Sequence, residues 1–269
     1  MPTQIIYYTN LKDVVGVRDI IRCVSLDWKP ESQLQTALGV DTLTGDIWGQ
    51  AVDLTNRALA AISGINLPVD DDHWRIVVAF DLYQAGERLA SVLTLLGRGY
   101  RDSADVLTRS LFEIAVNLSY IAKDVEQRLP EYLRHGSYPL SREDAEQILR
   151  KLSQESSAEM EDIVPRHAWK PLRAMCCDLG WLSEYERFYR YLSVVDHAGS
   201  FRIAASYERF LKGEPPSDLD KASVLLAALS LYLRVAELAA TVFPTQIKAE
   251  TITDLTAQCT EMGQFFAER

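Results

Sequence analysis

One short stretch, residues 184–200, holds side chains whose types and spacing could support chemistry by themselves. Read as a helix, it places Arg190, Ser193 and His197 at intervals of three and four residues, so all three point to one side. The arginine and the histidine are then two turns, about 10.5 Å, apart along the helix axis. A flexible guanidinium can shorten that distance, so one bound group could contact both side chains.

These residue types fit the cleavage of RNA without a metal ion. That reaction needs a histidine with a pKa near neutrality to move the proton of the 2'-hydroxyl or of the leaving group, and a fixed cation to hold the scissile phosphate. His197 and Arg190 meet those two needs. Ser193, one turn from each, could donate a hydrogen bond to the phosphate.

Two other interpretations of the same stretch stay open. His197 could be a buried histidine that hydrogen-bonds a carboxylate, Glu113 or Asp196, with the nearby arginine on the surface. Alternatively, Arg109 and Ser193 could join His197 in lining a pocket for a small ligand.

A second pair of charged residues, Arg109 and Glu113, lies four positions apart among apolar neighbours. Charges in such surroundings are costly to bury unless they are paired. The spacing predicts an ion pair within one helix, at the edge of the core. A functional interpretation is that Arg109 reaches a polar pocket and Glu113 orients it.

The helices that position these residues begin with a long antiparallel pair. Apolar residues recur every three or four positions across 72–96 and again across 102–123, which predicts two amphipathic helices. Asp72 is expected to start the first helix, and Asp102 to cap the second after a glycine turn. Because so short a turn joins them, the two helices must form an antiparallel αα-hairpin over 72–123.

Further helices follow the hairpin. They are predicted over 169–179, over 184–199 with a capping box at 183–186, over 218–243 after the cap Ser217, and over 246–267. The 218–243 helix is apolar over the length of a membrane span. Arg234 and Glu237 within it lie three positions apart and can pair along the helix, and two such charges near the middle of a span would be costly in lipid. We therefore interpret it as a buried core helix.

Composition divides the chain into two predicted parts. Residues 1–70 are interrupted by glycine and proline, and they are expected to form an irregular N-terminal helical cap or arm with helices near 11–24, 31–38 and 45–62. Residues 71–269 are expected to form one helical bundle domain. The predicted fold class is all-α, a helical bundle built on the long antiparallel αα-hairpin.

Composition also restricts partners and cofactors. The net charge of −10 argues against a protein that coats nucleic acid non-specifically, although residues 166–202, with six basic and four acidic side chains, are locally positive. The four cysteines have no spacing typical of metal ligands. We expect reduced thiols, no metal, no cofactor, no membrane segment and a cytoplasmic protein.

Two stretches of the sequence resemble a known family. Residues 95–113 and 189–197 are similar to the two signature stretches of a bacterial helical family catalogued as domain of unknown function 5677, with a similarity over roughly residues 72–243. The positions that carry it are Arg109, Glu113, Ser193 and His197.

The spacing of Arg190 and His197 also resembles the R-x4-6-H signature of HEPN ribonucleases. Those are helical proteins that act as dimers in toxin–antitoxin and anti-phage systems, with the two motifs brought together by two subunits. The resemblance implies a homodimeric, metal-independent endoribonuclease with an RNA substrate. We expect Arg109 and Glu113 to be supporting or binding residues of such a site. The alternative is a non-catalytic helical interaction or scaffold protein that binds a partner protein in a multi-protein bacterial system.

Overall fold

The computed structural model describes residues 23–26, 47–69, 72–136, 169–189 and 216–267. Across these ranges the chain is helical apart from one pair of short strands and the connecting turns, which confirms the all-α fold class. The elements are β1 (Cys23–Leu26), α3 (Ile47–Ala60), β2 (Ile65–Pro68), α4 (His73–Gly97), α5 (Arg101–Ala122), α6 (Val125–Gly136), α8 (Leu172–Leu179), α9 (Leu182–Glu184), the π-helical turn η1 (Tyr185–Tyr189), α12 (Asp218–Val242) and α13 (Ala249–Ala267).

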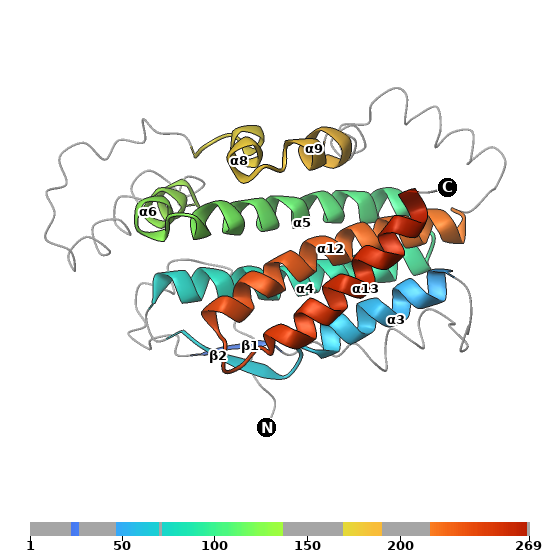
Figure 1. Ribbon diagram of the computed structural model, residues 1–269, viewed down its shortest axis with the longest axis horizontal. Coiled ribbons are helices and arrows are strands. Elements are labelled where there is room, and N and C mark those ends of the chain that lie inside the picture. The colour runs from blue at the N-terminus through green and yellow to red at the C-terminus, as the bar shows by residue number, and fades with distance from the viewer. Residues whose placement is uncertain (1–22, 27–46, 70–71, 137–168, 190–215, 268–269) are drawn as a thin grey trace, which may run out of the picture.

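The predicted hairpin is the pair α4 and α5. The carboxylate of Asp72 caps α4 as expected, since its Oδ1 accepts hydrogen bonds from the backbone N–H groups of Trp74 and Arg75 at 2.9 and 3.2 Å. Gly99 has a φ of 82°, which lets the chain reverse within a few residues. The two helices then run antiparallel along each other (Figure 1).

Asp102 was expected to cap α5, and this prediction is wrong. The residue before the helix is Tyr100, which makes no capping bond with its side chain, and Asp102 lies inside the first turn. The reason is the turn itself, because the Tyr100 N–H donates to the carbonyl of Leu95 at 2.8 Å and closes the reversal early. A carboxylate in the first turn still interacts favourably with the positive end of the helix dipole.

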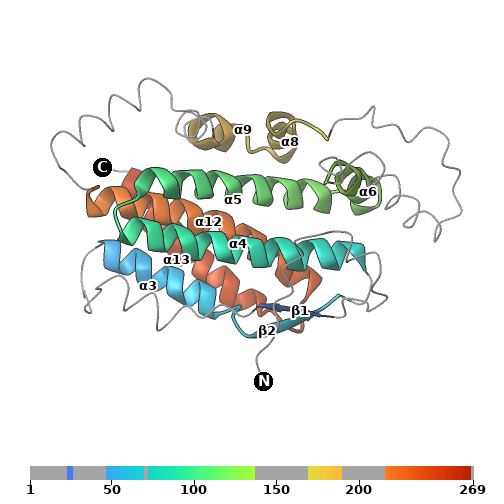
Figure 2. The same ribbon diagram turned by 180° about the vertical axis from the view of Figure 1, so that it is seen from behind.

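The central element is α12, which packs against α3, α4, α5 and α13. In Figures 1 and 2, α8 and α9 cover one side of α5, while α4 and α12 lie on its other side. By length and composition α12 could cross a membrane, and 67% of its apolar window is buried inside the bundle. Ser217 caps its start as predicted, because the Ser217 Oγ accepts from the Asp220 N–H at 3.1 Å.

The N-terminal part contains elements that differ from the expected ones. The helix expected near 45–62 is α3, but Cys23 and Val24, expected at the end of a helix over 11–24, form the strand β1. This strand pairs antiparallel with β2, so that Leu26 lies opposite Ile65. The rest of the expected 11–24 helix and the one over 31–38 lie outside the described residues.

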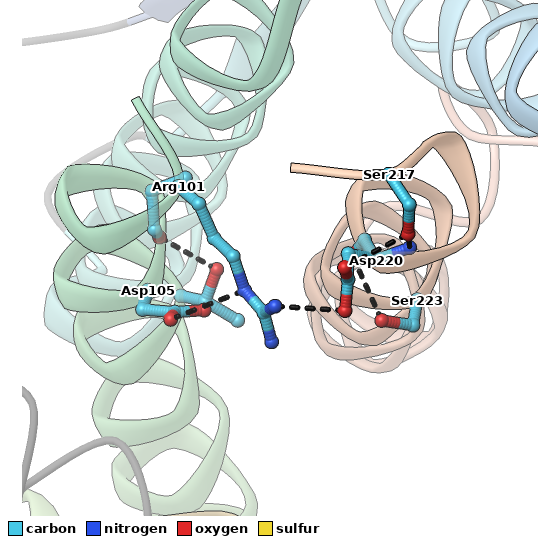
Figure 3. A network of polar contacts seen from close by, with 7 residues as sticks. Arg101, Asp105, Ser217, Asp220 and Ser223 are labelled. Carbon is cyan, nitrogen blue, oxygen red and sulfur yellow. Dashed lines mark hydrogen bonds and ion pairs between the residues drawn. The ribbon is translucent and has the colours of Figure 1, made fainter. Parts of the chain in front are cut away.

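A polar network ties the start of α5 to the start of α12 (Figure 3). The Arg101 guanidinium contacts Asp220 of α12, with 2.8 Å between Nη1 and Oδ1, and lies 3.9 Å from the carboxylate of Asp105. Asp105 is 1% exposed, whereas Asp220 is 43% exposed. Arg101 therefore supplies positive charge next to a buried carboxylate and joins two helices that are distant in sequence.

A buried carboxylate of a different kind lies in the middle of α4. Asp81 is 8% exposed, and no hydrogen-bond donor in the described part of the chain reaches its Oδ2. Burial raises the pKa of Asp81 to about 7, although the nearby charge of Arg88 opposes this shift. Asp81 also interacts with Tyr132 of α6, whose pKa is raised by burial and by this carboxylate.

The Arg101 network predicts that replacing Arg101 costs more stability than replacing Arg57. Arg101→Ala should lower the free energy of unfolding by about 3 kcal/mol, because it leaves Asp105 buried without its cation. Arg57→Ala is the matched control, since Arg57 pairs with Asp53 on the exposed side of α3, and it should lose less than about 1 kcal/mol. Urea denaturation measures both, and equal losses would contradict the role given to Arg101.

Asp81 predicts a pH-dependent difference in stability. Its pKa is higher in the folded protein than the ordinary 3.8, so the folded state loses stability as pH rises between these two values. Asp81→Asn removes this loss. The free energy of unfolding of the variant minus that of the wild type should therefore be about 2 kcal/mol larger at about pH 8 than at about pH 5. Asp53→Asn, at an exposed position, should show no such trend. Denaturation at the two pH values measures both variants. An equal difference between Asp81→Asn and the wild type at the two pH values would contradict the raised pKa of Asp81.

Candidate functional site

The residues predicted to be catalytic, Arg190, Ser193 and His197, lie outside the described residues. The structure does describe the chain up to Tyr189, the residue directly before Arg190. It also describes the two supporting residues on α5 and the elements that surround them. The described part of the candidate site is the segment that leads into the predicted catalytic stretch, together with the residues of α5 and α12 around it.

This leading segment differs from the single helix that the capping box predicted. Gly180, with a φ of 77°, ends α8, and the N–H of Trp181 donates to the carbonyl of Cys176 at 2.7 Å. The next helix therefore begins at once, at Leu182, and Ser183 is not its cap. Instead the Ser183 hydroxyl donates to Glu184 Oε2 at 2.7 Å. The π-helical turn η1 follows directly.

Arg109 and Glu113 form the ion pair that their spacing predicted, with 3.3 Å between Arg109 Nε and Glu113 Oε1. The pair also reaches across to η1. The hydroxyl of Tyr189 donates to Glu113 Oε1 at 2.8 Å and accepts from Arg109 Nη2 at 3.0 Å. The Arg109 guanidinium lies over the Tyr189 ring, 5.0 Å from its centroid. One tyrosine hydroxyl thus bridges both charged residues.

Aromatic packing holds the Tyr189 ring in place. Its centroid is 5.5 Å from that of Phe112 on α5 and 5.2 Å from that of Tyr185, on which it stacks. Burial, together with the hydrogen bond to Glu113, raises the pKa of Tyr189. The phenol therefore stays protonated near neutral pH, where it serves as a hydrogen-bond donor that anchors the segment.

A cleft of about 400 Å³ lies next to this network, between α5, α9 and α12. Its lining consists of three apolar residues, two serines and one pair of opposite charges: Phe112, Ala227, Leu231, Ser183, Ser230, Glu184 and Arg234. Phe112 belongs both to the cleft lining and to the packing around Tyr189. The network and the cleft are therefore adjacent parts of one region.

Arg234 contacts the segment of α9 and not Glu237, the partner that its spacing allowed. Its guanidinium lies over the ring of Trp181, 4.4 Å from the centroid, and its Nη2 is 3.8 Å from Glu184 Oε1. Glu237 instead accepts a hydrogen bond from Thr256 of α13 at 2.8 Å. The two residues are close along α12, but different neighbouring helices supply their partners.

The charged end of the cleft is ionised at neutral pH. Burial opposes ionisation of Glu184, but hydrogen bonds from Ser183 and from the backbone, together with the charge of Arg234, hold the pKa of Glu184 below its ordinary value. The Arg234 and Glu184 side chains are 36% and 39% exposed, so a ligand from solvent can reach them. The cleft thus presents one fixed cation beside one fixed anion.

Two buried thiols, those of Cys176 and Cys259, are poor nucleophiles. Burial is the main cause that raises the pKa of Cys176 to about 11, and Cys259 is affected in the same way. Within the described ranges, no three His, Cys, Asp or Glu side chains come together in an arrangement that could hold a metal ion.

Sequence reasoning found Arg109 and Glu113 because their pairing is local, but it missed the contribution of Trp181 and Arg234. A signal for Arg234 was present, since an arginine in an otherwise apolar helix needs a partner. For Tyr189 the signal was a run of tyrosines whose hydroxyls needed hydrogen bonds.

Comparison with known proteins places this region within a family. The model of a family of unknown function, DUF5677, matches residues 76–212, a range that includes both the Arg109 network and the predicted catalytic residues. Neither the curated proteins nor the solved structures gave a match to the chain.

The bridging hydroxyl predicts a measurable coupling. Tyr189→Phe removes the hydrogen bonds to Arg109 and Glu113 and should lower the free energy of unfolding by about 1 kcal/mol. In the background of Glu113→Gln the same change should cost less, because a bond to the carboxylate is already altered. Tyr185→Phe is the matched control on the stacked neighbour. Strictly additive losses in the double variant would contradict the coupling.

Proposed function

The chain belongs to DUF5677, a family of unknown function, and we propose that it is a HEPN-like, metal-independent endoribonuclease of a bacterial defence or toxin-type system. In this proposal His197 accepts the proton of a 2'-hydroxyl as that oxygen attacks the neighbouring phosphorus. The bond to the 5'-oxygen breaks, and the leaving oxygen takes up a proton. Arg190 stabilises the charge on the phosphate, and Ser193 donates a hydrogen bond to it.

The observation that supports the proposal most is the anchoring of Tyr189. This residue directly precedes Arg190, and its hydroxyl is bonded to both Arg109 and Glu113 on α5. The residue directly before the predicted catalytic segment is therefore held against α5 by two hydrogen bonds. A catalytic arginine needs such a support, because small displacements of a positioned group lower the rate strongly.

This arrangement gives Arg109 and Glu113 the role of positioning residues. Glu113 accepts a hydrogen bond from the Tyr189 hydroxyl. Arg109 donates a hydrogen bond to that hydroxyl, and its guanidinium lies over the ring. Neither needs to touch the RNA to affect cleavage. The proposal includes a homodimer, in which each subunit contributes one Arg190 and His197 pair.

RNA cleavage in the presence of EDTA tests the proposal. Wild-type protein should cleave total RNA, and His197→Ala or Arg190→Ala should lower the rate by at least about 100-fold, because a proton carrier or a phosphate cation is lost. His73→Ala is the matched control, since His73 is exposed at the start of α4, and it should cleave like the wild type. Light scattering should give the mass of a dimer.

Folding of each variant is checked by circular dichroism. A folded wild-type protein that leaves RNA intact would refute the ribonuclease and favour the alternative, a non-catalytic helical scaffold that binds a partner protein. Cleavage that persists in His197→Ala would refute the assignment of the catalytic histidine.

A further inference from the structure

We propose that the cleft between α5, α9 and α12 is a pocket for a guanine base. The proposal rests on the proposed function only for the identity of the polymer, in which one guanosine of a single-stranded RNA would occupy the pocket. A free guanine nucleotide should bind in the same place. The charges of the cleft, its hydrogen-bonding groups and its shape fit such a base.

The charges of the cleft favour a neutral polar group over a phosphate. Arg234 is the cation and Glu184 the anion of the lining, and the two are 3.8 Å apart. A phosphate drawn to the guanidinium would also meet the carboxylate and be repelled by it. A neutral ligand with acceptors and donors side by side can satisfy both groups together.

The hydrogen-bonding pattern selects guanine among the four bases. Its pairing edge presents the acceptor O6 followed by two adjacent donors, N1–H and the 2-amino group. An arginine beside a carboxylate complements that edge, because the guanidinium donates to O6 and the two carboxylate oxygens accept from the donors. Adenine, cytosine and uracil do not have two adjacent donors there, so each can give the carboxylate at most one hydrogen bond from that edge.

Neighbouring side chains hold both charged groups ready for this role. The ring of Trp181 supports the guanidinium of Arg234 from one side. The Ser183 hydroxyl donates to Glu184 Oε2, which fixes the carboxylate and still leaves lone pairs on both oxygens. Because the pKa of Glu184 lies below its ordinary value, the carboxylate is an acceptor at neutral pH.

The rest of the lining fits the flat apolar face of a base. Phe112, Ala227 and Leu231 present carbon atoms to the cleft. The Ser230 hydroxyl already donates a hydrogen bond to the carbonyl of Ala227 at 2.8 Å. It therefore needs no hydrogen-bond partner from a base that packs against it. A volume of about 400 Å³ falls within the range of small-molecule sites.

Calorimetric titration of the full chain with nucleoside monophosphates tests the pocket. Guanosine monophosphate should bind at least about tenfold more tightly than the adenosine, cytidine and uridine monophosphates, since each lost hydrogen bond to a charged group is worth about that factor. Inosine monophosphate lacks the 2-amino group and should bind about tenfold more weakly than the guanosine nucleotide. Inorganic phosphate should not compete.

Two variants locate the binding. Glu184→Gln should abolish the preference for guanine over adenine, and Arg234→Gln should weaken binding of the guanosine nucleotide by at least about tenfold. Glu186→Gln is the matched control, because Glu186 pairs with Arg173 and does not line the cleft. It should bind guanosine monophosphate like the wild type.

The outcomes separate this proposal from the ribonuclease. Equal binding of all four nucleotides, no binding of any, or unchanged guanine preference in Glu184→Gln would overturn the pocket, even if RNA is cleaved. Guanine-selective binding that depends on Glu184 would support it, even if no RNA is cleaved. Where RNA is cleaved, sequencing of the products should show a guanosine at a constant distance from the cut.

Discussion

The burial of α12 on nearly every side is the constraint on which the rest of the structure depends. Four helices, α3, α4, α5 and α13, pack around it, so most of its apolar surface is removed from water and stabilises the fold. A helix buried in this way cannot place a polar side chain freely. Each polar group on α12 has to face an edge of the packing or find a partner there.

That constraint explains where the charged residues of α12 lie. At its start, Asp220 pairs with Arg101, the first residue of α5. Further along, the guanidinium of Arg234 lies over the ring of Trp181 and next to the carboxylate of Glu184. Small side chains one and two turns before it, Ser230 and Ala227, leave space next to the charge. The cleft thus forms where an arginine and small side chains of α12 face α5 and α9.

The cost of burying charged groups at the edge of the core is offset in two different ways, by ion pairing and by a shift of pKa. Arg101 with Asp105, and Arg109 with Glu113, are paired, and each pair also connects α5 to a segment far away in sequence. Asp81 has no such ion pair with any residue that the structure describes, and burial raises its pKa instead. The pair of Arg109 and Glu113 also holds Tyr189, the residue directly before the proposed catalytic segment. In the proposed function, the contact from α5 to Tyr189 is what gives that segment a rigid base.

The sequence by itself determined those features whose physical cause is local. Periodic apolar residues predicted the hairpin of α4 and α5, Asp72 and Ser217 predicted two helix caps, and the i,i+4 spacing predicted the pairing of Arg109 with Glu113, because all of these contacts form within a few residues. The resemblance at Arg109 and Glu113 likewise agreed with the family that matches residues 76–212.

Only the tertiary structure decided which distant groups meet. The strand β1 exists because β2 pairs with it, and no pattern within residues 23–26 reveals that partner. Ser183 had the right spacing for a cap, yet the tight turn at Gly180 starts the helix earlier. Arg234 pairs with Glu184 although Glu237 lies one turn away on its own helix, because packing places Glu184 and Trp181 on its side. Local spacing limits which contacts can form, but the packing of α12 selects among them.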